Sequence, residues 1–315
     1  MFENGELDQY QPTGDYAIKF EKEAEEGKYQ YMVTDYPGTI GLRFNFINGG
    51  TSGLMSNVKI RKAISYSIDR EEMIDAVYGR YNPAYSYVAP AITFNGSSYR
   101  SQVGEIIEDE YNEYVGDPDK IVALFQEGLD ELGVETPIED ITLTYLTSGS
   151  TTEVQAEREY IQQSLEETLG LTVELSVAGD TSLFIADRNE GNYDFFLGGW
   201  YSDYNDPLDF LYTNYTDAYG MSFGGYSNTD YDALADQLVG ETDMDKRLDI
   251  YKQMEQILLL DDCAFAPIYY ATKQVLLQTG LRIIVLPLLV QVLSLSGLTS
   301  MEKISNRAQL VEGNA

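Results

Sequence analysis

Residues 193–207 read YDFFLGGWYSDYNDP, and the fold can be worked out from this stretch because an apolar run in it passes directly into a polar turn. The aromatic run from residue 193 to 200 predicts a buried strand. It ends at a glycine pair and at Trp200, the only tryptophan of the chain, and Asp203 follows. A core strand has no need of an indole at this place, whereas a binding crevice does. We therefore interpret the strand end as a candidate binding site.

The segments before this stretch alternate between strand and helix patterns. Apolar alternation predicts strands at 141–147 and 171–177, and amphipathic periodicity predicts helices at 152–169 and 181–188. Strands that alternate with helices imply a parallel, doubly wound sheet, whose ligand crevice lies beyond the carboxyl ends of its strands. The turn at residues 200–206 follows one of those ends.

The turn carries residue types that suit a peptide ligand. Gly199 and its glycine neighbour leave the backbone approachable, so an extended peptide can pair with this strand edge. Trp200 offers a flat apolar face with a polar tip, and Tyr201 and Ser202 follow it. Asp203 can hold an ammonium group through a charge-assisted hydrogen bond, which contributes about 1.5–3 kcal/mol. The alternative is a strand end and turn that contains a tryptophan incidentally.

The composition is that of a strongly acidic globular protein. The chain has 315 residues, enough for two lobes, and 43% of them are hydrophobic. Asp and Glu number 52 against 20 Lys and Arg, a formal net charge of −32. Nucleic acid and anionic membranes are therefore not expected as partners, because binding to phosphate needs clustered cations. The charge favours solubility, or alternatively a preference for cationic ligands.

Histidine is absent, and Cys263 is the only cysteine. The chain therefore lacks the commonest metal ligand and general base, and it cannot form an internal disulfide. We expect Cys263 to be a buried small hydrophobe, and we expect neither a metal nor a cofactor. The apolar run at 283–293 contains a proline and is too short to span a bilayer.

The remaining elements follow from caps and turn residues. Strands are expected at 29–36, 41–48 and 264–278, and helices at 58–68, 69–79 and 118–133, with two more within 230–260. Asn57 caps the first of these helices. Asp69 with Glu72 forms a capping box at the start of the second.

The blocks of this chain resemble, in order, the oligopeptide-binding proteins of ABC importers, the bacterial extracellular solute-binding proteins of family 5. FFLGGWYSDYNDP (195–207) resembles the family's crevice strand, and residues 57–90, from NVKIRKAISYSIDREE to the loop NPAYSYVAP, resemble its most recognisable block. FENGELDQYQ (2–11) and AFAPIYYATKQVLLQ (264–278) also match in place. The resemblance covers about residues 1–278.

The resemblance implies an α/β fold of the periplasmic-binding-protein type II, with one nearly complete lobe and a remnant of the other. Residues 1–48 would be the remnant of the first lobe and the hinge, and residues 49–267 the ligand-binding α/β lobe. Residues 268–281 would return to the first lobe. Residues 282–315 are then a tail without the family pattern.

For the site, the resemblance implies that Gly199, Trp200 and Tyr201, with Ser202 next to them, contact the ligand backbone. Asp203, three residues after the tryptophan, would hold the amino terminus of the ligand. Arg188 occupies a position where some members place an arginine in the cavity, or it is a solvated charge at a helix end. Tyr269 lines the crevice, or it is a core tyrosine.

The function implied is non-catalytic binding of peptides for uptake through the permease subunits of an ABC importer, by a monomer. The parent protein would work in the periplasm or at the outer face of the membrane. Alternatives are a glycan, a nickel complex or a signalling peptide as ligand, or a non-transport interaction protein. The absence of histidine argues against nickel. A carboxylate-dependent hydrolase is the enzyme alternative, but no specific carboxylate pair supports it.

Two features depart from the family. The polar sequence after Met1 is not a signal peptide, and the expected N-terminal part is missing, so we expect a fragment of a longer protein. After about residue 278 the pattern stops, although a neighbouring reading frame permits an aromatic-rich ending. A frame shift near residues 278–282 would explain this tail, and a divergent but genuine tail is the alternative.

Overall fold

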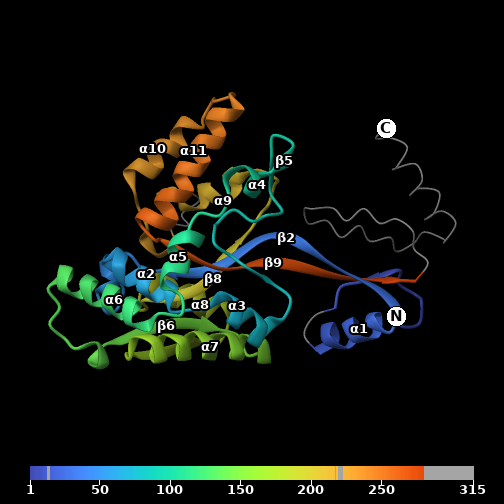
Figure 1. Ribbon diagram of the computed structural model, residues 1–315, viewed down its shortest axis with the longest axis horizontal. Helices are drawn as coiled ribbons and strands as arrows, with labels where there is room; N and C mark the ends of the chain where they lie inside the picture. Colours follow the sequence, from blue (N-terminus) through green and yellow to red (C-terminus); the bar gives the residue numbers. More distant parts are fainter. Residues whose placement is uncertain (13–14, 217, 219–222, 280–315) are drawn as a thin grey trace.

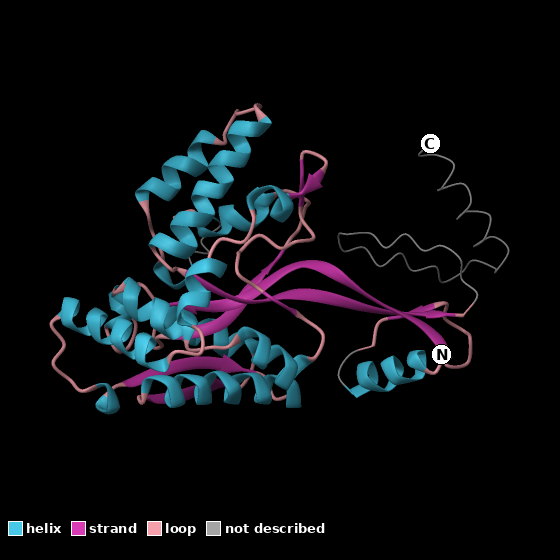
Figure 2. Cartoon of the chain, in the orientation of Figure 1, coloured by secondary structure: helices cyan, strands magenta, loops and turns pink. Residues whose placement is uncertain are grey.

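The computed structural model describes residues 1–12, 15–216, 218 and 223–279. In this part of the chain one seven-stranded sheet has the order β1-β9-β2-β8-β6-β7, and β3 pairs with β9. Figures 1 and 2 show helices packed around the wide part of this sheet. The tail expected at residues 282–315 lies outside the described residues.

Three strands form the parallel part of the sheet. β6 (Thr142–Ser148) pairs in parallel with β7 (Thr172–Ala178) along its whole length. It also pairs in parallel with β8 (Phe195–Tyr201), but only at residues 195 and 196 of that strand. The doubly wound pattern predicted from the sequence is confirmed for these strands. On its other edge β8 pairs antiparallel with β2, so the sheet as a whole is mixed.

Two long strands connect the α/β part with the other end of the molecule. β2 (Tyr29–Phe44) and β9 (Phe265–Gln278) pair antiparallel and run side by side to β1 (Gln9–Tyr10) and α1 (Asp15–Glu25), as Figure 1 shows. The prediction of two separate strands at 29–36 and 41–48 was wrong. β2 continues through Pro37, where the pairing register with β9 shifts.

The predicted helix caps are confirmed. Asn57 accepts from the backbone of the first turn of α2 (Val58–Tyr66), and Asp69 accepts from the Glu72 amide at the start of α3 (Arg70–Met73). The remaining helices are η3 (Ile74–Tyr78), α4 (Tyr99–Val103), α5 (Glu108–Tyr114), α6 (Pro118–Leu132), α7 (Thr152–Leu169), α8 (Thr181–Glu190), α9 (Pro207–Leu211), α10 (Thr229–Gln237) and α11 (Met244–Gln256). Short strands are β3 (Asn82–Pro83), β4 (Thr93–Phe94) and β5 (Ser97–Ser98). Single turns are η1 (Ile47–Gly49), η2 (Leu54–Ser56), η4 (Ile138–Asp140), η5 (Tyr212–Asn214), η7 (Phe223–Gly225) and η8 (Ile257–Asp261).

A fully buried arginine ties the helix pair to the sheet. The Nε of Arg70 donates to the carbonyl oxygens of Ala84, at 3.1 Å, and Pro267, at 2.7 Å. Its guanidinium lies 4.1 Å from the ring centre of Tyr111. These contacts fix the loop after η3 against β9. Cys263 is buried near this core, as predicted, and burial raises the pKa of its thiol to about 11.

Candidate functional site

The C-terminal half of β8 has one edge without a strand partner in the described chain. β2 pairs with all seven residues of β8, from Phe44 opposite Phe195 to Gly38 opposite Tyr201. β6 pairs with residues 195 and 196 alone. The backbone groups of residues 197–201 on that edge are therefore available to an added strand.

The glycines of β8 have a structural reason as well. A Cβ on Gly199 would lie 2.0 Å from the carbonyl oxygen of Thr39, which no side chain tolerates. The close approach of β2 therefore requires glycine at this position, whatever binds at the other edge.

A buried aspartate orients the tryptophan. The indole Nε1 of Trp200 donates to Oδ2 of Asp209 at 2.9 Å, and the backbone amide of Asp203 donates to the same oxygen at 2.8 Å. Asp209 is buried in α9, whose first turn is capped by Asp206. Sequence reasoning missed Asp209, although the sequence DPLD at 206–209 signals a helix start just after the candidate turn. One carboxylate thus sets both the indole and the turn.

The side chain of Asp203 is exposed and has no hydrogen-bond or ion-pair partner among the described residues. Ser202 is different, because it is buried and engaged in the turn. Its Oγ donates to the carbonyl oxygen of Tyr204 at 2.5 Å, and its amide donates to that of Pro37 at 2.7 Å. Between Ser202 and Asp203, it is therefore Asp203 whose side chain is unpaired and can bind a cationic group.

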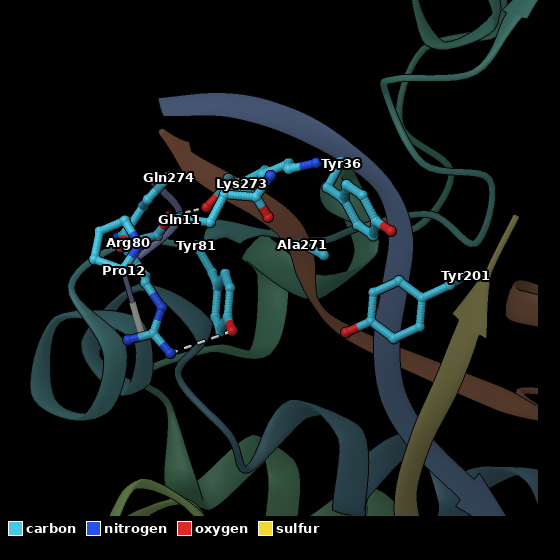
Figure 3. Close-up of a pocket in the computed structure, with 10 residues that line it drawn as sticks. Gln11, Pro12, Tyr36, Arg80, Tyr81, Tyr201, Ala271, Lys273 and Gln274 are labelled. Carbon is cyan, nitrogen blue, oxygen red and sulfur yellow. Dashed lines mark hydrogen bonds between the residues drawn. The ribbon is translucent and has the colours of Figure 1, made fainter. Parts of the chain in front are cut away.

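Tyr201 lines one end of a hollow of about 430 Å³ beside the long strands β2 and β9 (Figure 3). Its ring is half exposed and lies 5.7 Å from that of Tyr36. The other lining residues are Gln11, Pro12, Arg80, Tyr81, Ala271, Thr272, Lys273 and Gln274. The hollow thus adjoins the C-terminal end of β8 on the side of β2 and β9, away from the free strand edge.

Tyr269 lies directly behind this hollow. Its ring is buried and stacks on that of Tyr81, with ring centres 4.6 Å apart and planes 2° apart. The structure therefore shows Tyr269 as a buried tyrosine that packs behind Tyr81, a residue of the lining.

Glu157 of α7 is a second residue that sequence reasoning missed. Burial raises the pKa of its carboxyl to about 7, while a hydrogen bond from Tyr269 acts in the opposite direction. The Tyr78 hydroxyl also donates to it. The available signal is its position on the inward face of the helix, three residues after Val154 and four before Ile161.

Arg188 lies apart from the other candidates. It sits near the C-terminal end of α8, close to Tyr193. Burial raises the pKa of Tyr193 to about 12, and the positive charge of Arg188 opposes this rise. In a βαβ crossover the helix runs back along the sheet, so its end lies where the next strand begins. Arg188 is thus at the start of β8, whereas Trp200 is at its end.

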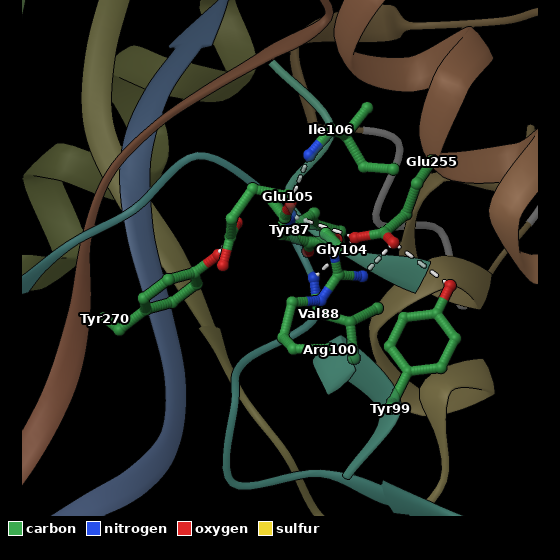
Figure 4. A network of polar contacts seen from close by, with 10 residues as sticks. Tyr87, Val88, Tyr99, Arg100, Gly104, Glu105, Ile106, Glu255 and Tyr270 are labelled. Atoms are coloured by element: carbon green, nitrogen blue, oxygen red, sulfur yellow. Dashed lines mark hydrogen bonds and ion pairs between the residues drawn. The ribbon is translucent and has the colours of Figure 1, made fainter. Parts of the chain in front are cut away.

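A buried polar network holds the loop next to the site (Figure 4). The carboxylate of Glu255 accepts from the amides of Tyr87, at 3.1 Å, and Val88, at 2.9 Å. It also accepts from the Tyr99 hydroxyl at 3.0 Å and forms an ion pair with Arg100. Both charged side chains are almost fully buried. The loop between β3 and β4 is therefore fixed to α11.

Within the described residues, no cluster of three or more acidic or cysteine side chains is placed to hold a metal. In the same part of the chain no helix is both long and apolar enough to cross a membrane.

The mixed α/β sheet has the periplasmic-binding-protein type II fold, and its free strand edge ends near an indole and an unpaired carboxylate. Residues 1–222 match the model of the bacterial extracellular solute-binding proteins, family 5 Middle. The chain belongs to this family.

Two curated relatives come from Bacillus subtilis. The chain is 29% identical over 238 residues to the oligopeptide-binding protein OppA, covering 74% of this chain and 41% of the relative. It is 29% identical over 272 residues to the dipeptide-binding protein DppE, covering 86% and 46%. The chain thus spans less than half the length of these relatives.

Two solved structures share the fold. Listeria monocytogenes OppA, bound to peptide, has a TM-score of 0.68 at 29% identity, over 88% of this chain and 50% of that one. The substrate-binding domain of an oligopeptide ABC transporter from Bacillus anthracis has a TM-score of 0.72 at 24% identity, over 88% and 51%.

Proposed function

We propose that this chain binds extended peptides, as part of a solute-binding protein that delivers them to an ABC importer. The observation that carries the proposal is the free edge of β8 at residues 197–201, which leads to Trp200 and to the unpaired carboxylate of Asp203. The relatives named above are described as oligopeptide- and dipeptide-binding proteins, and one structure holds a peptide.

In the proposed mode of binding, the backbone of the peptide adds to the sheet as a further strand. Main-chain hydrogen bonds along residues 197–201 supply affinity without reading side chains. The indole of Trp200, held in place by Asp209, forms a flat wall against the peptide. Asp203 pairs with the α-amino group, a bond of about 1.5–3 kcal/mol.

The proposal also covers the partners, the location and the lobes of the protein. The chain binds without catalysis, acts as a monomer with the permease subunits of the importer, and works outside the cytoplasmic membrane. Residues 49–267 form the ligand-binding lobe, while residues 1–48 and 268–281 belong to the hinge and the other lobe. β2 and β9 span both parts, and a bend in them would move one part against the other.

The test is a titration of the 315-residue chain with short alanine peptides that have a free amino terminus. Trp200, as the only tryptophan, reports occupancy of the crevice through its fluorescence, and calorimetry gives the heat. We expect saturable binding. The absence of both signals at about 1 mM peptide, which corresponds to only about 4 kcal/mol of binding free energy, overturns the proposal.

A further inference from the structure

The turn that carries Asp203 is attached to the rest of the molecule on both sides of this residue. Before it, the amide of Ser202 donates to the carbonyl oxygen of Pro37 in β2 at 2.7 Å. After it, the carboxylate of Asp206 accepts from the hydroxyl of Tyr251, in α11, at 2.9 Å. The Asp203 carboxylate itself is exposed and has no partner among the described residues. An unpaired charge is thus carried by a backbone that several contacts hold in place.

Asn205 adds an attachment to a distant part of the chain. Its side-chain oxygen accepts from the backbone amide of Thr93 at 2.8 Å, and its side-chain nitrogen donates to the Thr93 hydroxyl at 2.6 Å. A backbone amide can only donate, so this contact fixes which end of the carboxamide faces it. The two residues are 112 positions apart in the sequence. The pair of bonds therefore joins the turn to the strand β4, which begins at Thr93.

The element that Asn205 reaches is a firmly held hairpin. β4 and β5 are joined by Asn95 and Gly96, whose positive φ angles of 48° and 83° form a tight two-residue turn. The ring of Phe94 is buried and lies edge-on to that of Tyr251, with ring centres 5.4 Å apart. Figure 1 shows the hairpin on the same side of the sheet as α9 and α11. The hairpin is thus packed against α11, the helix that also holds the turn.

These contacts form a closed ring around the turn. Asn205 binds the hairpin, the hairpin packs on Tyr251, and Tyr251 donates to Asp206, the residue after Asn205. A backbone held in this way has few conformations, so little conformational entropy is lost when Asp203 binds a cation. Asn205 is exposed and Thr93 is partly exposed, so water can replace their bonds when either is substituted. The pair therefore matters more for the geometry of the turn than for overall stability.

We propose that Asn205 is a positioning residue for the amine-binding carboxylate. Through its two bonds to Thr93 it holds the turn so that the carboxylate of Asp203 is in place before a peptide arrives. Asn205 acts on the ligand only through Asp203. The inference rests on the proposed function and deepens it, because it explains how the site discriminates between a free and a blocked amino terminus.

The experiment measures the preference for a free amino terminus. Trialanine amide and its N-acetylated twin are titrated into the 315-residue chain and followed by the fluorescence of Trp200 and by calorimetry. The ratio of the two dissociation constants is the amine preference. Because the twins differ only at the amino terminus, a general weakening of the crevice lowers both affinities and leaves the ratio unchanged.

Three variants at this contact change the number of bonds without altering any charge. Asn205→Ala removes both bonds, Thr93→Val removes only the bond to the hydroxyl, and Thr93→Ser keeps both. We expect Asn205→Ala to lower the amine preference about three- to tenfold and Thr93→Val about two- to threefold, since a neutral hydrogen bond has a modest net contribution. Thr93→Ser should keep the preference of the wild type. So should Asn112→Ala, the matched control at an exposed asparagine of α5. The N-acetylated peptide should lose about twofold or less in every variant.

A double variant separates positioning from direct contact. In an Asp203→Asn background no charge remains to be placed, so the addition of Asn205→Ala should not lower the amine preference further. A further loss would mean that Asn205 contacts the amine itself, and this result overturns the proposal.

The remaining outcomes separate the inference from the proposed function. If peptides bind and the amine preference survives in Asn205→Ala, or if both twins weaken equally, the positioning role is wrong while peptide binding stands. A wild-type chain that binds both twins equally well also overturns the inference. If neither peptide binds at about 1 mM, the proposed function fails and the inference fails with it. Retained binding of the N-acetylated twin shows that each variant is folded.

Discussion

The indole nitrogen of Trp200 donates to the carboxylate of Asp209 at 2.9 Å, across the turn that leads from β8 into α9. The same oxygen receives the backbone amide of Asp203. Asp209 is buried, so its charge is stabilised by these two donors and not by bulk water. The orientation of the proposed binding wall and of the proposed amine ligand therefore depends on one side chain that itself lies behind the site.

The first prediction concerns this aspartate. Asp209→Ala leaves the indole N–H and the Asp203 amide without their acceptor, and both groups become free to move. We expect about tenfold weaker binding of every peptide, with little dependence on sequence, measured by calorimetry. In a Trp200→Phe background the same substitution should cost less, because the indole bond is already absent. Equal losses in both backgrounds would contradict the positioning role.

The second prediction concerns the amino terminus of the peptide. Asp203→Asn removes the charge and keeps the shape of the side chain. We expect binding of peptides with free amino termini to weaken by about 10- to 100-fold, as the loss of a charge-assisted bond implies. N-acetylated twins, which bind more weakly to the wild type, should change by about twofold or less. Similar losses for both kinds of peptide would rule out contact with the amine.

The third prediction separates packing from binding at β8. Gly199→Ala places a Cβ 2.0 Å from a backbone oxygen of β2, so the paired strands must part. We expect the free energy of unfolding to fall by about 2–3 kcal/mol or more, measured by urea denaturation. Gly179→Ala is the control, because its Cβ meets only Leu183 at 3.5 Å. If the two variants are equally stable, the backbone of β2 can move away from a side chain at position 199, which would contradict the prediction.

Much of the fold could be predicted because its signals are local. The caps at Asn57 and Asp69 depend on side chains within three residues of the helix, so the sequence contains the whole interaction. β2 could not be predicted as one strand, because a proline normally interrupts a ladder. The structure accommodates Pro37 where the register with β9 shifts, and that requires knowledge of the partner strand.

The residues of the candidate site also fall into those that the sequence reveals and those that only the fold reveals. Trp200 and Asp203 stand out in the sequence by residue type and by neighbours. Asp209 and Glu157 do not, because their roles come from groups that the fold brings to them, such as the Tyr269 hydroxyl from β9. Arg188 shows the converse, since its residue type suits an anion but the crossover carries it to the other end of β8.

The fourth prediction concerns the network around Glu255. Glu255→Ala leaves Arg100 charged and buried without its partner, along with two backbone amides. We expect a loss of about 3–5 kcal/mol in the free energy of unfolding. The double variant, in which Arg100→Met is added, should lose less than the sum of the two single variants, since no uncompensated charge remains. Additive losses would mean that the two charges do not interact.

The fifth prediction follows from the pKa of Glu157, which burial raises to about 7 from a usual value of 4.5. The folded state binds this proton more tightly than the unfolded state. The contribution of the group to stability is therefore fully present below about pH 4.5 and declines as the pH rises to about 7. Above that pH the carboxyl is ionised in both states, so the free-energy cost of burying its charge in the folded state no longer changes with pH.

Glu157→Gln removes this titration and keeps a hydrogen-bonding side chain among the tyrosines. Relative to the wild type, we expect the variant to be equally stable near pH 4.5 and about 1–3 kcal/mol more stable near pH 8, measured by urea denaturation. The difference between the two proteins is the useful quantity, because the many other carboxyls titrate in both. Glu159→Gln, at an exposed position of the same helix, should shift stability by less than about 0.5 kcal/mol. A variant that loses stability near pH 8 would mean that the Tyr78 and Tyr269 hydroxyls stabilise the charge by more than its burial costs.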